Sequence, residues 1–136
     1  MSPTAVSRPR PRILIGGSGE RKTLRLVAQY ADACHINAAD LDVARHKLGV
    51  LREHCHTVNR DYTEIEKTCG MRLTIAADGS NLEEVIQAIS AAGEAGFDMV
   101  TTALPDVYNL KVIELFARDV IPRVAPINSR VSATSR

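Results

Sequence analysis

The sequence of 136 residues has little of what a nucleic-acid or membrane surface requires. It contains no Trp, and aromatic residues make up only 4% of the chain, so a platform of side chains that stack on bases is not expected. The formal net charge is +1, and the two signs are mixed along the chain, which excludes a concentrated basic face. No apolar run approaches the ~20 residues that cross a bilayer. We therefore expect neither nucleic acid nor a membrane as a partner.

Cysteine is also scarce, and its number is odd. The three cysteines are Cys34, Cys55 and Cys69. The N-terminal residues are rich in Pro, Ser and Arg and contain no apolar segment of the kind that directs secretion. These features predict reduced thiols and a cytoplasmic protein.

The hydrophobic fraction, by contrast, is 45%, which is enough for the core of one domain. We expect this domain at residues 12–124. The polar segments on either side, residues 1–11 and 125–136, are expected to be a flexible lead and a flexible tail.

Strand and helix patterns alternate four times along the chain. Strands are predicted at residues 13–15, 33–36, 71–75 and 97–104, the first of them buried on both faces, and an amphipathic helix follows each. Repeated βα units predict an α/β fold with a parallel sheet and right-handed crossovers. Two architectures fit: a small doubly wound sheet, or half of an eight-stranded (βα) barrel, which takes roughly 250 residues when complete.

Several residues are expected to mark the helix ends. Asp40 is a predicted N-cap, and Ser80 with Glu83 has the spacing of a capping box. The glycines at 93 and 96 are predicted C-terminal stops. Pro122 is expected to end the last helix, which is predicted at residues 106–121.

The stretch "RILIGGSGERKT" resembles a nucleotide-binding loop but fits neither common motif. A P-loop requires a glycine immediately before its lysine, and Arg21 occupies that position. The dinucleotide fingerprint G-x-G-x-x-G lacks its third glycine because Lys22 stands there. What remains is a strand that delivers Gly16, Gly17 and Gly19 to the start of a helix, where free amides favour a phosphate. The alternative is a tight βα turn in which the glycines only relieve steric crowding.

Other side chains are candidates for chemistry. His35 lies near the carboxyl end of a predicted strand, where (βα) barrels place their active sites, and can act as a general acid or base there. Arg72 and Thr74 share the polar face of the third predicted strand. If this face lines the barrel interior, Arg72 requires an anionic partner, for which Asp98 or a cofactor phosphate is suitable. Thr101 and Thr102 also precede a strand end, although nothing in their spacing requires a ligand.

The segment "EHCH" at residues 53–56 suggests a metal site. On a helix, however, His54 and His56 are two residues apart and point in nearly opposite directions. Cys55 falls on the apolar stripe. We therefore predict no metal, and a solvated histidine pair beside a core cysteine.

Several segments together resemble the luciferase-like monooxygenase family, specifically the branch that uses the deazaflavin coenzyme F-420. They are "ILIGGSGERKTLRLVAQYADAC", "KLGVLREHCHTVNRD", "EIEKT", "GFDMV" and "ELFARDVIPRV". The resemblance is to the C-terminal half of the barrel and extends over residues 8–124. It implies a TIM-type (βα)8 fold of which this chain contains four units.

The resemblance also implies a cofactor and a site. Members of the family transfer hydride with coenzyme F-420 or use reduced flavin with oxygen, so F-420 is the expected cofactor and FMN the alternative. The resemblance assigns the cofactor phosphate to Gly16, Gly17, Ser18 and Gly19, and it places Asn37 at the cofactor mouth.

Two functional hypotheses follow. The chain is either an oxidoreductase segment that carries the cofactor-phosphate loop, or a truncated, non-catalytic half-barrel that binds a phosphate ligand or a partner chain. Half a barrel has open sheet edges, so we expect a homodimer or binding to a complementary half. Small-molecule cofactor and substrate are the other expected partners.

Overall fold

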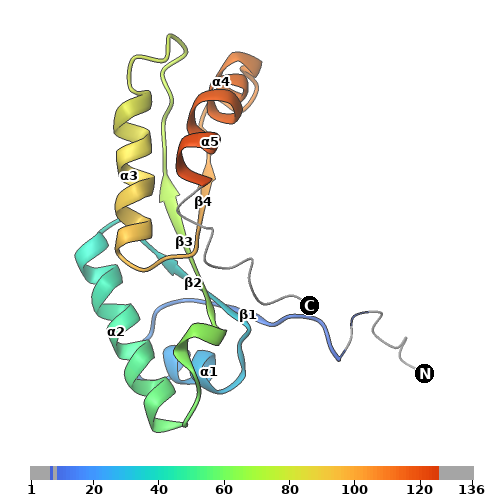
Figure 1. Ribbon diagram of the computed structural model, residues 1–136, viewed down its shortest axis with the longest axis vertical. Coiled ribbons are helices and arrows are strands. Elements are labelled where there is room, and N and C mark those ends of the chain that lie inside the picture. The colour runs from blue at the N-terminus through green and yellow to red at the C-terminus, as the bar shows by residue number, and fades with distance from the viewer. Residues whose placement is uncertain (1–6, 8, 126–136) are drawn as a thin grey trace.

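A computed structural model describes residue 7 and residues 9–125, so the predicted lead and tail lie largely outside the described residues. One parallel sheet contains four strands in the order β1-β2-β3-β4 (Figure 1). The α/β prediction with a parallel sheet is confirmed. The strands are β1 (Leu14–Gly16), β2 (Ala33–Asn37), β3 (Glu66–Arg72) and β4 (Met99–Ala103).

Helices follow each strand. They are α1 (Thr23–Tyr30), α2 (Leu41–Thr57), α3 (Leu82–Glu94), α4 (Leu110–Leu115) and α5 (Ile121–Val124), with a 3-10 turn at Tyr62–Glu64 and a π-helical turn at Phe116–Val120. Figure 1 shows α1 and α2 beside the lower part of the sheet and α3, α4 and α5 beside the upper part. The core is divided in the same way, because one apolar cluster joins α1 and α2 to β2 and β3, and a second joins α3 to α4.

The strand register separates two sets of side chains. Ile36 pairs with Cys69, and Cys69 with Val100, and all three belong to or pack against the apolar core on the helix side. One residue further on, Asn37 pairs with Gly70 and Gly70 with Thr101. Since side chains alternate along a strand, this second set faces away from the helices, on the side that forms the interior of a (βα) barrel.

The third strand lies earlier in the sequence than predicted. The expected strand at residues 71–75 is wrong beyond Arg72, because β3 is Glu66–Arg72. The alternation of apolar and polar residues in this stretch still corresponds to alternating burial, since Leu73 and Ile75 are buried and Thr74 is exposed. Strand pairing ends at Arg72 because its partner on β4 is Ala103, the last residue of that strand.

Two of the predicted helix ends are confirmed. The Asp40 carboxylate accepts hydrogen bonds from the amides of Asp42 and Val43 at 2.9 and 3.0 Å. At the end of α3, Gly96 has a φ of +107°, and Phe97 donates to the carbonyl of Ala92 at 3.2 Å. This is the Schellman arrangement, which requires a left-handed residue that glycine adopts without strain.

The predicted capping box is wrong. Asn81 holds the N-cap position of α3, and its side-chain oxygen accepts from the amide of Ala76 at 2.8 Å. Ser80 precedes this position and donates its amide to Asp78. The side chain of Asn81 therefore closes the turn before the helix and does not cap the helix itself.

The predicted end at Pro122 is also wrong. The helical run begins at Leu110, after an Asn109 cap, and continues through Pro122 to Val124. Pro122 lacks an amide proton and would clash with the preceding turn of a regular helix. The π-helical turn at Phe116–Val120 widens the helix just before the proline and accommodates it.

The first strand is an edge strand with one open face, so the prediction that it is buried on both faces is wrong. Leu14 is 57% exposed, whereas Ile15 packs against the core. Asp32 holds the start of this strand. Its carboxylate accepts from the amide of Ile13 at 2.7 Å and from the guanidinium of Arg10, and its own amide donates to the carbonyl of Ile13 at 2.8 Å.

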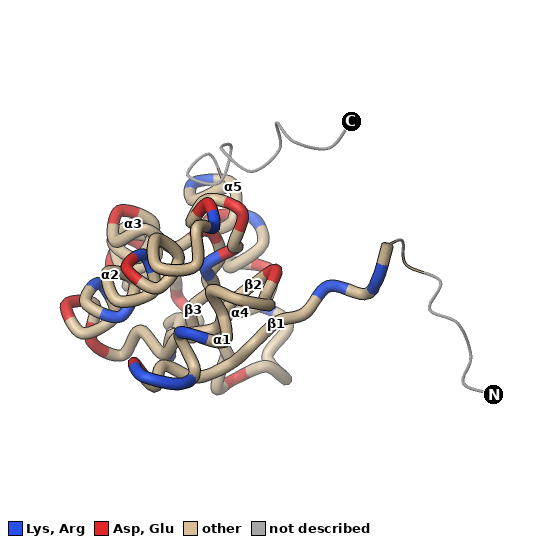
Figure 2. The backbone as a smooth tube through the Cα atoms, turned by 90° about the horizontal axis from the view of Figure 1, so that it is seen from below, with Lys and Arg blue, Asp and Glu red and all other residues tan. Residues whose placement is uncertain are grey.

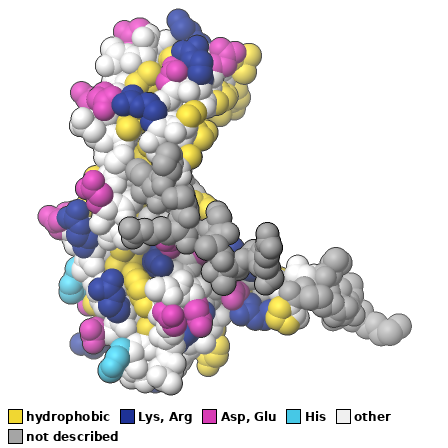
Figure 3. All heavy atoms as spheres, viewed as in Figure 1, with side chains coloured by type: hydrophobic (Ala, Val, Ile, Leu, Met, Phe, Trp, Pro, Cys, Tyr) yellow, Lys and Arg dark blue, Asp and Glu magenta, His cyan; other side chains and the backbone are white. Residues whose placement is uncertain are grey.

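The surface of the described helices carries both charge signs. Figure 2 shows Lys and Arg segments interspersed with Asp and Glu segments over these helices. None of the helices in the described part of the chain combines the length and apolar character needed to cross a bilayer. Yellow apolar side chains gather on the right edge of the upper part in Figure 3, over α4, where Tyr108 and Leu110 are 95% and 71% exposed.

The Asp32 contacts predict a pH dependence. The hydrogen bond from Arg10, followed by that from the Ile13 amide, lowers the pKa of Asp32 from 3.8 to about 2. A carboxylate with a depressed folded-state pKa stabilises the fold above its unfolded pKa, and this contribution is lost as the pH falls from about 4 towards 2. Asp32→Asn should therefore flatten the fall in unfolding free energy over this range, as measured by urea denaturation at each pH.

A matched control for this experiment is Asp42→Asn, because the Asp42 side chain is 90% exposed. Its profile should follow that of the original chain. Identical slopes for all three proteins between pH 4 and pH 2 would contradict the assigned role of Asp32.

Candidate functional site

A cavity of about 870 Å³ lies at the carboxyl ends of the strands. The residues that line it come from the loop after β1, the ends of β2 and β3, and β4. They include Gly17, Ser18, His35, Asn37, Gly70, Arg72, Thr101 and Thr102. The structure thus brings together four of the predicted site residues, Gly17, Ser18, His35 and Asn37. Gly16 and Gly19 belong to the same loop but not to the lining.

The lining favours an anion. Arg72 is exposed, its side chain makes no hydrogen bond or ion pair with any described residue, and no Asp or Glu lines the cavity. A guanidinium without a carboxylate neighbour attracts phosphate and carboxylate groups and binds them through parallel hydrogen bonds. The cavity is therefore suited to a ligand with a negatively charged end.

The glycine loop uses one of its amides in the sheet and leaves others free. Gly17 donates its amide to the carbonyl of His35 at 3.0 Å. The amides of Ser18 and Gly19 have no acceptor among the described residues. Unpaired loop amides ahead of a helix form a site for anions. Of the four loop residues, Ser18 and Gly19 are thus the available donors.

Gly17 has a structural requirement of its own. Its φ is +111°, and a Cβ there would lie 3.4 Å from the Thr23 side chain. Gly16 has open space around it. The loop therefore needs glycine at position 17 for backbone conformation, independently of any ligand.

Asn37 shapes the cavity rim. Its side-chain oxygen accepts from the amide of Ala39 at 2.9 Å, which turns the chain from β2 towards α2. The amide of Ala38, which lies between these two residues, donates to the carbonyl of Gly70 at 3.1 Å. The Asn37 side-chain NH₂ group makes no hydrogen bond to a described residue, so it remains a donor for a ligand.

The expected pairing of Arg72 with Asp98 does not occur. Asp98 binds Lys67 instead, with 3.1 Å between the carboxylate and the Lys67 Nζ atom, and it also accepts the Lys67 amide at 2.8 Å. Lys67 lies on the helix side of β3, where it is 7% exposed and sits 4.8 Å from the centroid of the Tyr62 ring. This pair satisfies a buried ammonium group and leaves Arg72 available on the opposite face.

The residues of the "EHCH" segment do not converge. His54 donates from Nε2 to the carbonyl of Glu20 at 2.7 Å, and His56 is exposed. Cys55 is buried in the core. Within the described residues, no group of three His, Cys, Asp or Glu side chains is placed to hold a metal ion.

The three cysteines are free and buried. Burial raises the pKa of Cys34 and of Cys69 to about 11, and it also raises that of Cys55. Because the thiolate is the reactive form, these cysteines are core residues and poor nucleophiles.

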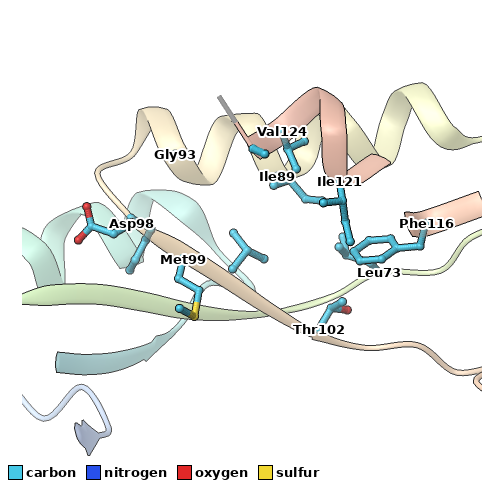
Figure 4. A pocket seen from close by; sticks show the side chains of 12 residues that line it. Leu73, Ile89, Gly93, Asp98, Met99, Thr102, Phe116, Ile121 and Val124 are labelled. Carbon is cyan, nitrogen blue, oxygen red and sulfur yellow. The ribbon is translucent and has the colours of Figure 1, made fainter. Parts of the chain in front are cut away.

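A second, apolar cavity of about 280 Å³ lies between β4, α3 and α5. Figure 4 shows Ile89, Phe116, Ile121 and Val124 around it. Its polar lining residues are Asp98 and Thr102. Asp98 is already paired with Lys67, so this cavity lacks the free polar groups found at the strand ends.

The chain matches the luciferase-like monooxygenase family over residues 1–114. It belongs to this family. No curated protein matches it. Among solved structures, it resembles an F-420-dependent secondary alcohol dehydrogenase in complex with an F-420–acetone adduct, with a TM-score of 0.70 and 17% sequence identity. The similarity covers 86% of this chain and 50% of that chain, so this luciferase-like chain spans half the length of the dehydrogenase. The predicted half of a (βα)8 barrel is confirmed.

Gly70 is a cavity residue that the sequence did not reveal. A Cβ at Gly70 would lie 3.0 Å from the His35 Nε2 atom. A glycine inside a strand destabilises it by roughly 0.5–1 kcal/mol relative to alanine and often marks a close approach of another group. The only signal in the sequence was this glycine itself, which lies just before the strand predicted at residues 71–75.

Proposed function

We propose that this chain is the cofactor-phosphate segment of a luciferase-like oxidoreductase, which performs hydride transfer or monooxygenation with coenzyme F-420 or reduced flavin. The observation that carries the proposal is the cavity at the strand ends, where the free amides of Ser18 and Gly19 lie in one loop and the unpaired Arg72 lies in the lining. Membership of the family is compatible with either cofactor, and the likeness to an F-420-dependent dehydrogenase supports F-420.

The residues present fit the phosphate end of such a cofactor. Ser18 and Gly19 would donate backbone hydrogen bonds, Arg72 would supply charge, and Asn37 would donate from its side-chain NH₂ group. When bound, the deazaflavin or flavin ring supplies the hydride or activates oxygen. The chain's own contribution is to bind and orient: it holds the anionic end, and the strand ends form one wall of the cavity.

The second candidate function is a non-catalytic half-barrel that binds a phosphate ligand or a partner chain. The open edges of the sheet favour it. Leu14 on β1 and Met99 on β4 are 57% and 44% exposed, and both edges present unpaired backbone groups of the kind that recruit further strands. The two candidates share the anion site and differ in whether this chain supports turnover.

The phosphate assignment predicts a difference between FMN and riboflavin, which differ by the phosphate group. Ser18→Glu should weaken FMN binding on the order of tenfold or more, because a carboxylate beside the phosphate repels it, and should leave riboflavin binding unchanged. Fluorescence titration measures both affinities. Gln87→Glu is the control, since it adds the same charge on the exposed face of α3 and should change neither affinity.

Ser18 suits this test better than Gly17, where any side chain would strain the loop at its φ of +111°. Equal affinities of the unchanged protein for FMN and riboflavin, or no effect of Ser18→Glu, would show that the loop does not hold the phosphate.

The open edges predict association. We expect a homodimer in which β1 of one copy meets β4 of the other, unless a complementary half-barrel is present. Sedimentation at micromolar concentration should give a dimer, and Leu14→Lys should shift it towards monomer because a charge replaces an apolar contact. Val43→Lys, at a 52% exposed position on α2, should not. A monodisperse monomer with a cooperative melt would contradict this expectation.

The same geometry predicts low activity for the chain alone. Positioning of donor and acceptor can contribute ~7–11 kcal/mol to catalysis, and an anchor at the phosphate end leaves the ring end without walls that exclude water. With saturating reduced F-420 and a panel of enones and quinones, turnover should be far below that of a complete family member. Robust, saturable turnover that is abolished by His35→Asn would instead make this chain a minimal enzyme.

A further inference from the structure

His35 is held on the inner face of the sheet by a chain of two hydrogen bonds. Its Nδ1 atom lies 2.9 Å from the hydroxyl of Thr68, and this hydroxyl donates to the carbonyl of Cys34 at 2.8 Å. A hydroxyl has one proton, and a carbonyl oxygen can only accept. The Thr68 hydroxyl can give its proton to only one of the two groups; with Cys34 as the acceptor, it accepts from His35, and the neutral imidazole carries its proton on Nδ1.

The other ring nitrogen then has a free lone pair. His35 Nε2 makes no hydrogen bond to a described residue. The ring is half-buried and lines the cavity, so this atom is accessible to a ligand. It lies over Gly70, 3.0 Å from the position that a Cβ would occupy. A Cβ at position 70 would require the ring to shift by a few tenths of an ångström. Gly70 thus provides the space in which the ring can keep this orientation.

We infer that His35 Nε2 is a hydrogen-bond acceptor for an O–H or N–H group of the bound cofactor, with Thr68 and Gly70 as the residues that position it. The inference rests on the proposed function, because the ligand is the one that the phosphate loop anchors. It adds a second kind of contact to the cavity. The backbone amides of Ser18 and Gly19 and the guanidinium of Arg72 can only donate to an anionic end, whereas His35 accepts from a neutral group in the part that FMN and riboflavin share.

The first test needs no ligand. Long-range ¹H–¹⁵N spectra of the histidine rings, recorded on the 136-residue chain at a pH where the rings are neutral, distinguish the two tautomers. His35 should show the Nδ1–H form. His54 is an internal control, because it donates from Nε2 to the Glu20 carbonyl and should show the opposite form. A His35 ring with its proton on Nε2 would overturn the inference, whatever the outcome of any binding experiment.

The second test compares glycine-to-alanine variants in binding. Gly70→Ala should weaken FMN and riboflavin by a similar factor, about three- to tenfold, which corresponds to one hydrogen bond. Gly49→Ala is the control, since a Cβ at that exposed position of α2 meets nothing within 4 Å. A similar loss of affinity for both ligands distinguishes the effect of Gly70→Ala from that of Ser18→Glu, which should weaken the binding of FMN alone.

A second pair of variants keeps the inference testable if Gly70→Ala fails to fold. Thr68→Val removes the hydroxyl at nearly constant volume and should shift the His35 tautomer and weaken both ligands. Thr68→Ser retains the hydroxyl and should bind both ligands as the unchanged protein does.

Unchanged affinity in a folded Gly70→Ala or Thr68→Val protein, or a His35 Nε2 signal that does not move on FMN binding, would overturn the contact. No binding of FMN, riboflavin or F-420 by the unchanged protein would overturn the proposed function and, with it, the contact, but would leave the tautomer assignment standing.

Discussion

The parallel register of β2, β3 and β4 decides which side chains of this chain are available for chemistry. On β3, Cys69 packs towards the helices, whereas Gly70 and Arg72 reach the cavity. Because side chains alternate with a period of two, a slip by one residue would exchange the two sets. The cavity would then be lined by thiols and apolar groups, and the guanidinium would lie in the core without a partner.

Lys67 helps to fix this register. Its ammonium group lies on the helix side of the sheet, where it can be accommodated only because Asp98 binds it and the Tyr62 ring covers it. Asp98 also accepts the Lys67 amide, so one carboxylate joins the side chain and the backbone of β3 to the start of β4. A shifted strand would lose both contacts and leave a buried charge unpaired. The specificity of the pairing therefore comes from a polar group as well as from apolar packing.

The parts of the fold that could be predicted were those encoded by local chemistry. Asp40 and Gly96 mark helix ends through their own side chain or backbone freedom, and the glycines after Ile15 correctly placed a loop between β1 and α1. The position of β3 could not be predicted, because "EKTCGMR" has no simple apolar alternation and its place is set by pairing with β2 and β4. The prediction that the last helix ends at Pro122 failed for a similar reason. The π-helical turn before Pro122 belongs to a helical run that packs on α3, and this packing is not visible in the local sequence.

For the candidate site, the sequence could predict which residues meet at the strand ends, but not how the His35 side chain is oriented. Gly17 follows β1, and His35 and Asn37 lie in the carboxyl half of the neighbouring β2, so their meeting at the carboxyl edge follows from the topology. That the His35 ring lies over Gly70 depends on a side-chain orientation, which Thr68 selects from the next strand.

The cavity consequently has two regions with different hydrogen-bonding groups. The loop after β1 supplies donors because a glycine backbone leaves its amides free. The centre of the sheet supplies an acceptor, because a hydroxyl, an imidazole and a missing side chain occupy three adjacent positions on two strands. A ligand with an anionic end and a neutral hydrogen-bond donor some distance from it satisfies both regions at once.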